Sequence, residues 1–240
     1  LVDKLGDQGF AFVDIDPELT RHEDNTLDIR YRIEEGPRVY VEHINITGNT
    51  RTLDRVIRRE FRLVEGDPYS TSRLQRSEQR LRNLGFFEDV KVETRQGSSP
   101  DRLALDVGVT EQSTGEVSFG AGFSTVDGLL ANFGVSERNF LGRGQRLRLS
   151  GTLAADRQQY DIRFTEPYFL GRDVAAGFDL FRTTRDFAAE SSFDQETFGG
   201  RLRFSYAVTE NLRHSVNYDY RDVQVIDVAS NASRFIRDQE

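Results

Sequence analysis

Histidine, aspartate and glutamate are the side chains of this sequence that could bind a metal or transfer a proton. The histidines His22, His43 and His214 are isolated, and none stands in a metalloprotease motif or at a metal-ligand spacing. Acidic residues are abundant, but no pair is set apart as an acid and base couple. Cysteine is absent, which removes thiolate ligands, thiol nucleophiles and disulfides. We therefore predict a protein that is not an enzyme, with no catalytic residue, metal or cofactor.

Two glycines begin a pattern that is known from nucleotide-binding loops. The segment Gly120-Ala121-Gly122 lacks the later glycine and the following helix of a dinucleotide loop, and it lies within an alternating segment. No Gly-x-Ser-x-Gly motif is present either. We interpret these glycines as flexible backbone within a strand.

The charge of the chain argues against nucleic acid as a partner. Its 32 basic residues are scattered among 40 acidic ones, and the net charge is −8. No apolar run reaches the ~18 residues of a membrane helix, but membrane strands face lipid only at every second residue and escape this test. Because the chain begins at Leu1 without a leader sequence, we expect it to be a piece of a longer protein.

The first half contains a repeat with an offset of 76 residues. Leu5, Gly9 and Phe10 correspond to Leu81, Gly85 and Phe86 at this offset. Five alternating positions also correspond, namely Leu27, Ile29, Tyr31, Ile33 and Glu35 with Leu103, Leu105, Val107, Val109 and Glu111. The sequence therefore predicts two copies of one module, of which the first is truncated.

The complete copy begins with a strand and two helices. The strand ends in the turn signal Gly48-Asn49. Apolar residues at helical spacing predict the first helix, and they are Leu53, Val56, Ile57 and Phe61. The second helix follows Pro68, with Ser72 and Gln75 at the spacing of a capping box, and it stops at Gly85.

Two strands, over residues 86–94 and 103–109, complete a β-α-α-β-β order. A sheet that is covered on one face by two helices forms a small domain of its own. Its outer strand edge would keep unpaired backbone groups, which could accept an extended chain or could simply be solvated.

Beyond residue 117 the sequence predicts about seven long alternating segments, many near the ~10 residues that a tilted membrane strand needs. Apolar residues share one face and ionic residues the other, as in Leu147, Leu149 and Leu153 against Arg146, Arg148, Ser150 and Thr152. The same holds for Tyr160, Ile162 and Phe164, for Phe198, Leu202 and Phe204, and for Val216, Tyr218 and Tyr220.

A soluble antiparallel sheet shows the same alternation, so the pattern does not distinguish a core from lipid. Two features favour a membrane. Aromatic residues gather at segment ends, as at Phe140, Tyr168, Phe169 and Tyr206, and short turns near residues 142–144 and 156–157 contrast with a predicted long loop over residues 185–196. An odd, unclosed set of strands cannot span a bilayer alone, so we expect further strands elsewhere in the protein.

Several short motifs resemble the BamA family of outer-membrane assembly proteins. The segments 36–41 (GPRVYV), 44–49 (INITGN) and 84–90 (LGFFEDV) resemble the last POTRA domain of that family. Segment 114–125 (TGEVSFGAGFST) resembles the start of its first barrel strand.

Two further segments, 139–144 (NFLGRG) and 166–170 (EPYFL), resemble early turn and strand-end motifs of the same barrel. The residues that carry these motifs are Asn139, Gly142, Gly144, Glu166, Pro167 and Tyr168. The resemblance implies an antiparallel transmembrane β-barrel, present here as its first strands only. We divide the chain into the end of one POTRA domain (1–36), a complete last POTRA domain (37–111) and the start of the barrel (112–240).

The resemblance also implies function, namely that the family inserts unfolded outer-membrane protein precursors into outer-membrane lipid, with its POTRA domains in the periplasm. Arg58, Arg62 and Glu65 match the stretch that docks the lipoprotein BamD, although exposed charges on a helix are a simpler explanation. The first barrel strand would form a seam that opens, and its candidate residues are Val117, Phe119, Gly120 and Gly122. Glycine weakens a strand, but ordinary close packing of strands also calls for it.

Two rival functions remain at this point. The chain could belong to the related branch that secretes proteins through the barrel, as in two-partner secretion. It could also be a soluble multi-domain β protein that is used only for binding.

Overall fold

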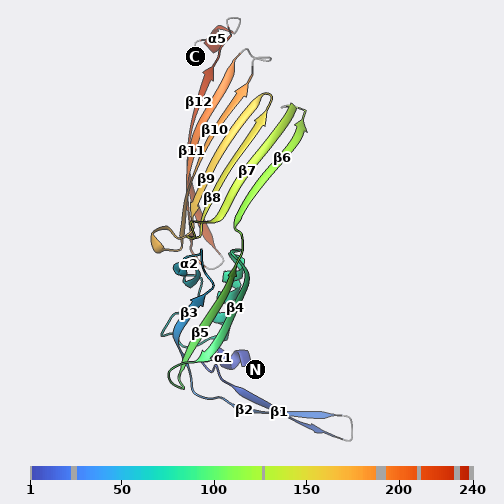
Figure 1. Cartoon of the computed structure of the whole chain (residues 1–240), viewed down its shortest axis with the longest axis vertical. Helices are drawn as coiled ribbons and strands as arrows, with labels where there is room; N and C mark the ends of the chain where they lie inside the picture. Colours follow the sequence, from blue (N-terminus) through green and yellow to red (C-terminus); the bar gives the residue numbers. More distant parts are fainter. Residues whose placement is uncertain are drawn as a thin grey trace. The chain divides into compact units, whose positions relative to one another are not determined.

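The computed structural model describes residues 2–22, 26–125, 128–187, 193–209, 212–229 and 233–237 (Figure 1). The chain divides into two compact units, Leu1–Ser113 and Thr114–Glu240, which we call the first and the second unit. No helix among the described residues combines the length and the apolar character needed to cross a membrane.

The first unit contains the predicted β-α-α-β-β order. Its elements are β3 (Tyr40–Thr47), α2 (Asp54–Arg58), α3 (Thr71–Asn83), β4 (Phe87–Gln96) and β5 (Arg102–Glu111). The sheet order is β3-β5-β4, with β3 parallel and β4 antiparallel to β5. The central strand β5 therefore has a partner on both sides.

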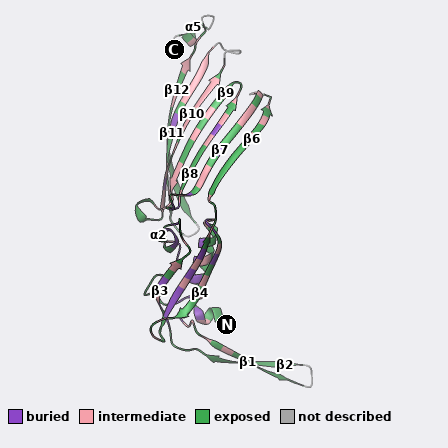
Figure 2. Cartoon of the chain, viewed as in Figure 1, coloured by how far each residue is buried: buried purple, intermediate pink, exposed green. Residues whose placement is uncertain are grey.

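A single core joins the sheet of the first unit to its two helices. Ile57 of α2 and Leu81 of α3 are fully buried with Leu105 of β5. Each such side chain contributes about 1.5–3 kcal/mol when it is fully removed from water. Figure 2 shows buried residues concentrated in this unit.

One detail of each predicted helix is wrong, beginning with the extent of the first helix. The first helix ends at Arg58, and Leu53 precedes it as an exposed cap residue. Phe61 is buried, but it lies in a tighter turn in which its N–H bonds to the carbonyl of Arg58. A single helical turn suffices here because tertiary packing holds Val56 and Ile57.

The cap of the second helix is also different from the predicted one. Ser70, rather than Ser72, is the N-cap, because its backbone is extended and its hydroxyl accepts the N–H of Arg73 at 3.3 Å. The N–H of Ser72 donates instead to Asp7 Oδ1 at 2.9 Å. The helix does stop where it was predicted to stop, with Gly85 at a φ of 68°.

The elements before residue 37 match the end of the module. They are α1 (Val2–Gly6), β1 (Asp14–Arg21) and β2 (Leu27–Glu34), and β1 and β2 form an antiparallel pair. Gly9, the counterpart of Gly85, also has a left-handed backbone, with a φ of 99°. The repeat thus extends from the sequence to the backbone.

The second unit is an antiparallel sheet of seven strands in consecutive order. The strands are β6 (Gly115–Ser124), β7 (Gly128–Phe140), β8 (Gln145–Ala154), β9 (Arg157–Glu166), β10 (Val174–Asp186), β11 (Asp194–Ala207) and β12 (Arg213–Ile226). The short helices η1 (Phe169–Gly171) and α5 (Arg234–Arg237) accompany them. The seven predicted segments are confirmed, and Gly120 and Gly122 lie in β6 as predicted.

The register places apolar residues of all seven strands on one face. One row across the sheet contains Phe119, Phe133, Gly151, Tyr160, Arg182, Phe198 and Asp222, and the next contains Val117, Val135, Leu149, Ile162, Leu180, Gly200 and Tyr220. The neighbouring positions, which face the other way, include Ser150, Asp161, Asp179 and Arg201. The predicted separation into an apolar and an ionic face therefore extends over all seven strands in the second row, whereas Arg182 and Asp222 interrupt the apolar face in the first row.

One predicted loop is wrong. Residues 185–186 and 194–196 belong to β10 and β11, and Arg185 pairs with Gln195. Both strands are longer than the sequence indicated, because polar residues that resemble a loop also occupy this mostly half-buried end of the strand pair. Residues 188–192 of the predicted loop lie outside the described residues. The short turn over residues 141–144 is confirmed, whereas Arg157 already begins β9.

Candidate functional site

The three predicted docking residues lie at the surface of the first unit, and two of them contact each other. Arg58 Nη1 lies 3.3 Å from Glu65 Oε1, and Arg58 Nε lies 3.0 Å from Asp54 Oδ2. Arg62 is also exposed, and its backbone N–H donates to Ser77 Oγ at 2.8 Å. The three residues therefore share one surface region of the first unit, in which Arg58 and Glu65 bind each other.

This pair also has a structural role that the sequence did not reveal. Glu65 Oε1 accepts the N–H of Ile44 at 3.1 Å, and Arg58 Nη2 donates to the carbonyl of Ile44 at 3.1 Å. Ile44 lies on β3, which is an edge strand of its sheet. Arg58 and Glu65 thus satisfy the backbone groups that an incoming strand would otherwise use.

Backbone bonds from residues 66–69 close the part of this edge that precedes Ile44. The N–H of Val41 donates to Asp67 O at 2.9 Å, and the N–H of Gly66 donates to Val41 O at 2.8 Å. Val39 O accepts the N–H of Tyr69 at 3.0 Å. The prediction of an open outer edge is therefore wrong for β3, because a loop of the same domain pairs with it. β4, the other outer strand, pairs only with β5 among the described residues.

Glu111 organises the loop after β3, and its role was missed. Its carboxylate accepts the backbone N–H groups of Thr50, Arg51 and Thr52 at 3.1, 2.9 and 2.7 Å, and the Thr50 hydroxyl at 2.8 Å. Burial raises the pKa of Glu111, but these bonds outweigh it and lower the pKa from 4.5 to about 2. The signal in the sequence was its repeat position, which matches Glu35.

Gly48 allows this loop to approach β5. A Cβ atom at Gly48 would lie 1.9 Å from the carbonyl oxygen of Val109, and its φ is 89°. Only glycine fits such a position. The Gly48-Asn49 motif is thus explained by a close backbone contact together with the Asn49 side-chain bond to Thr52 O at 3.0 Å.

The four predicted seam residues lie on β6, at the end of the strand order. β6 pairs with β7 only among the described residues. Val117 and Phe119 are 80% and 81% exposed and belong to the apolar face. A Cβ atom at Gly120 would meet no atom within 4 Å, and one at Gly122 would make an ordinary contact of 3.5 Å with Leu130. Close packing within the described residues therefore does not explain these glycines, in contrast to Gly151, which lies under the Phe133 ring.

The six motif residues at the turns lie at the end of the sheet where β6 begins. Asn139 is buried, and its Oδ1 accepts the N–H of Gly144 at 2.7 Å. Gly142 and Gly144 have φ values of 69° and 70°, which favour glycine.

Glu166 joins this turn to the next one along the sheet. Its Oε2 accepts Gln145 Nε2 at 2.8 Å, and its Oε1 accepts the N–H of Tyr168, beyond Pro167, at 2.9 Å. The structure therefore brings Asn139, Gly144, Glu166 and Tyr168 into one turn network, with Gln145 as the link that the sequence did not identify.

Ion pairs cross the polar face of the sheet. Asp179 lies 3.2 Å from Arg163 Nε and 2.9 Å from Arg203 Nη2, and Arg203 also donates to Thr165 Oγ1 at 2.9 Å. Arg203 can cross β10 because Gly177 has no side chain there: a Cβ atom would lie 2.9 Å from Nη2. These bonds tie β9, β10 and β11 together.

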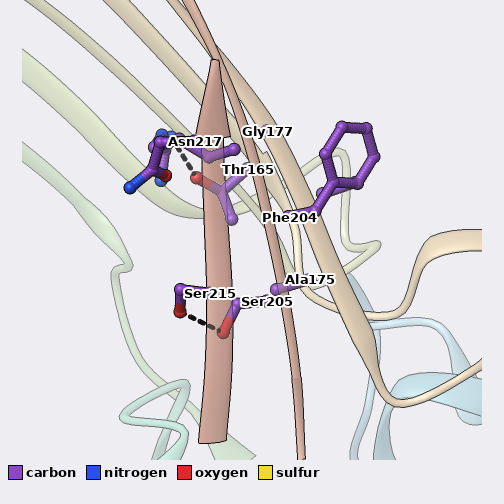
Figure 3. Close-up of a pocket in the computed structure, with 9 residues that line it drawn as sticks. Thr165, Ala175, Gly177, Phe204, Ser205, Ser215 and Asn217 are labelled. Carbon is purple, nitrogen blue, oxygen red and sulfur yellow. Dashed lines mark hydrogen bonds between the residues drawn. The ribbon is translucent and has the colours of Figure 1, made fainter.

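A small pocket of about 210 Å³ lies beside Arg203 on this face. Ser215 Oγ donates to Ser205 Oγ at 2.9 Å along its wall, and Phe204 points away from these hydroxyls (Figure 3). Within the described residues, no group of three or more His, Asp or Glu side chains is arranged to hold a metal ion. The prediction that no cofactor is needed stays a prediction.

Two family profiles match the chain in the order of its two units. The POTRA profile, described as a surface antigen variable number repeat, matches residues 39–112, and the Omp85 superfamily domain profile matches residues 139–239. The chain belongs to the Omp85 superfamily.

Relatives of this Omp85 chain match it over most of its length. Outer membrane protein assembly factor BamA of Neisseria meningitidis is 35% identical over 213 residues, which are 86% of this chain and 27% of that protein. BamA of Nitratidesulfovibrio vulgaris is 30% identical over 245 residues, which are 100% of this chain and 30% of that protein. The chain therefore spans less than a third of these curated relatives.

A solved structure supports the same assignment. The crystal structure of BamA from Haemophilus ducreyi lacking POTRA domains 1–3 has a TM-score of 0.81 and 30% identity, and covers 93% of this chain and 43% of that chain. The chain is thus an outer-membrane protein with a periplasmic POTRA part, and its seven strands resemble the start of a BamA barrel that is not closed within the described residues.

Proposed function

We propose that the protein assembles β-barrel proteins into the outer membrane. The observation that carries this proposal is an exposed edge strand, β6, which follows a POTRA domain and contains two glycines that no described neighbour requires. Relatives at 30–35% identity are named assembly factors, which supports a non-enzymatic role. We propose residues 1–36, 37–111 and 112–240 as the two POTRA segments and the barrel segment.

Reconstitution tests this function. The complete protein in lipid vesicles should accelerate the protease-resistant folding of an unfolded outer-membrane precursor over empty vesicles. No acceleration would contradict assembly. Delivery of the substrate into the vesicle interior, rather than insertion into the bilayer, would favour the secretion alternative instead.

The seam proposal needs a separate experiment. The chain has no cysteine, so a disulfide between Gly120→Cys and a cysteine on the last barrel strand would lock β6 cleanly. Locking should stop assembly, and reduction should restore it. The matched control joins Gly120 to Asn132, its register partner on β7, which should leave assembly intact. Unimpaired assembly with the seam locked would refute the gating role.

We further propose that precursors add as a strand to β4. This edge is favoured because the edge of β3 is already closed by its own loop, by Arg58 and by Glu65. A photoreactive side chain at Thr94 of β4 should cross-link an arriving precursor more strongly than one at Asn45 of β3. Equal yields at both positions would support a merely solvated edge.

Lipoprotein docking at Arg58, Arg62 and Glu65 is proposed for a BamD-like partner. Glu65→Lys should abolish co-purification of the lipoprotein at physiological salt. Since Glu65 also binds Ile44, Glu65→Gln is the matched control: it keeps an oxygen acceptor for that N–H and removes the charge. If Glu65→Lys leaves co-purification unchanged, the assignment fails. If the lysine variant unfolds and the glutamine variant binds normally, the role of Glu65 is structural.

A further inference from the structure

A repeated carboxylate contact fixes the ends of two strands in the second unit. Glu137 Oε1 accepts the N–H of Asn139 at 2.7 Å, and Glu166 Oε1 accepts the N–H of Tyr168 at 2.9 Å. In both cases a glutamate accepts the backbone N–H two residues further on: Glu166 is the last residue of β9, and Glu137 lies where the register of β7 shifts near its end. Such a bond to an acidic side chain fixes the start of a turn.

Each of these glutamates also binds the start of the neighbouring strand. The Thr114 hydroxyl donates to Glu137 Oε1, and Gln145 Nε2 donates to Glu166 Oε2. Thr114 directly precedes β6, and Gln145 is the first residue of β8. The same device therefore holds β6 to β7 and β8 to β9.

The register places Glu137 where an unpaired carboxylate would be unfavourable. Glu137 is the partner of Gly115 and Leu147, so it belongs to the apolar face, where a carboxylate needs bonding partners. A Cβ atom at Gly115 would lie 3.1 Å from Glu137 Oε2, so glycine leaves room for the carboxylate. The carbonyl of Thr114 also accepts the N–H of Arg138 at 3.2 Å. Thr114 is thus held by its side chain and its backbone.

The other half of β6 differs in composition. From Gly120 onward the strand carries Gly120 and Gly122, and Phe123 is 78% exposed. Glycine adds backbone freedom and removes cross-strand contacts. The start of β6 is therefore tied to Glu137 of β7, and the half from Gly120 onward has more backbone freedom.

We propose that Glu137 is a positioning residue that anchors the turn end of β6, so that this strand bends from Gly120 onward while its first residues keep their register. The proposal deepens the seam role of β6 and rests on that proposed function for its biological meaning. The anchoring itself is independent of assembly, and it predicts where β6 is protected.

Amide hydrogen exchange of the complete protein in detergent micelles, without substrate, tests this anchor. Glu137→Ala should speed exchange at residues 115–118 by about tenfold, since it removes two bonds to a charged acceptor. Residues 121–124 should change by less than about twofold. Glu166→Ala is the matched control, and it should affect residues 145–148 and leave 115–118 unchanged.

Two milder variants keep the test decisive if Glu137→Ala does not fold. Glu137→Gln retains an oxygen acceptor and should restore most of the protection, whereas Thr114→Val should speed exchange at residues 115–118 by about threefold. Equal effects of Glu137→Ala and Glu166→Ala on β6 would overturn the proposal, as would uniform loosening of the whole strand or no effect of Thr114→Val. If any of these results were found while the Gly120 disulfide still stopped assembly, the proposed role of Glu137 would be refuted and the proposed assembly function would not.

Discussion

Strands β5 and β9 have the same alternation of apolar and polar residues, but their apolar faces have different surroundings. In β5, Leu103 and Leu105 are fully buried, because residues of α2 and α3 share their core. In β9, Tyr160 and Ile162 are 44% and 42% exposed, because no described helix of the second unit joins a core with them. Alternation therefore determines that a segment forms a strand with one apolar and one polar face. What covers the apolar face, helices or another apolar medium, depends on the rest of the structure.

The second unit needs another apolar covering for a face that extends over seven strands. Soluble proteins rarely expose an apolar area of this size. Lipid provides the covering in a membrane barrel, and the opposite face, with its arginine and aspartate pairs, then lines the interior. The same sequence pattern thus faces a protein core in the first unit and lipid in the second.

The largest effect is expected in the core of the first unit. Leu105→Ala should destabilise that unit by about 2–5 kcal/mol, because it leaves a cavity in a fully packed site. Leu53 before α2 is 40% exposed and serves as the matched control, so Leu53→Ala should cost less than about 1 kcal/mol. Urea unfolding followed by helical circular dichroism measures both. Equal losses would show that burial does not determine the cost of these substitutions.

A charge on the apolar face of the second unit separates lipid from water. Leu149→Arg should destabilise the barrel by about 2–4 kcal/mol in a bilayer. Ser150→Arg, one residue away on the polar face, should cost less than about 1 kcal/mol. Folding titrations of the complete protein in lipid vesicles give both values, and a reversed order would assign the faces the other way round.

Acid should weaken the first unit through Glu111. Because its pKa is lowered from 4.5 to about 2 on folding, the stabilisation is complete above pH 4.5 and is lost as the pH falls towards about 2. Glu111→Gln should cost about 1–2 kcal/mol near neutral pH, because solvent screens part of the interaction, and it should flatten this pH dependence. Urea unfolding at a series of pH values checks the prediction. An unchanged pH profile in the variant would show that Glu111 is not the responsible group.

The smallest effect is expected on the polar face. Arg201 and Asp219 form an ion pair in which both side chains are about half exposed. Arg201→Gln should therefore change stability by less than about 1 kcal/mol. Folding titrations like those for Leu149→Arg measure it. A larger loss would indicate that this face is far less hydrated than an open sheet suggests.

Much of the fold could be predicted from the sequence because the patterns were local. Alternation indicated all seven strands, and helical spacing together with alternation indicated the order of the first unit. The failures involve contacts between distant residues. Ser70 replaces Ser72 as the helix cap because Asp7 binds the Ser72 N–H, a contact across 65 residues.

The candidate sites were predicted less completely than the fold. Motif resemblance selected Glu65 and Glu166, but it did not reveal their bonds to Ile44 and Gln145, since neither partner is near in sequence. Glu137 and Glu111 carried no motif of their own, although Glu111 stood at a repeat position. Their roles depend on which backbone N–H groups the fold brings within reach.

Spin labels on adjacent residues of β8 test the central claim most directly, namely that the apolar face of the second unit contacts lipid. In the complete protein in vesicles, a label at Leu149→Cys should collide frequently with dissolved oxygen and rarely with a water-soluble nickel complex. A label at Ser150→Cys should show the opposite preference. Equal access of the nickel complex to both labels would contradict the membrane assignment of this sheet.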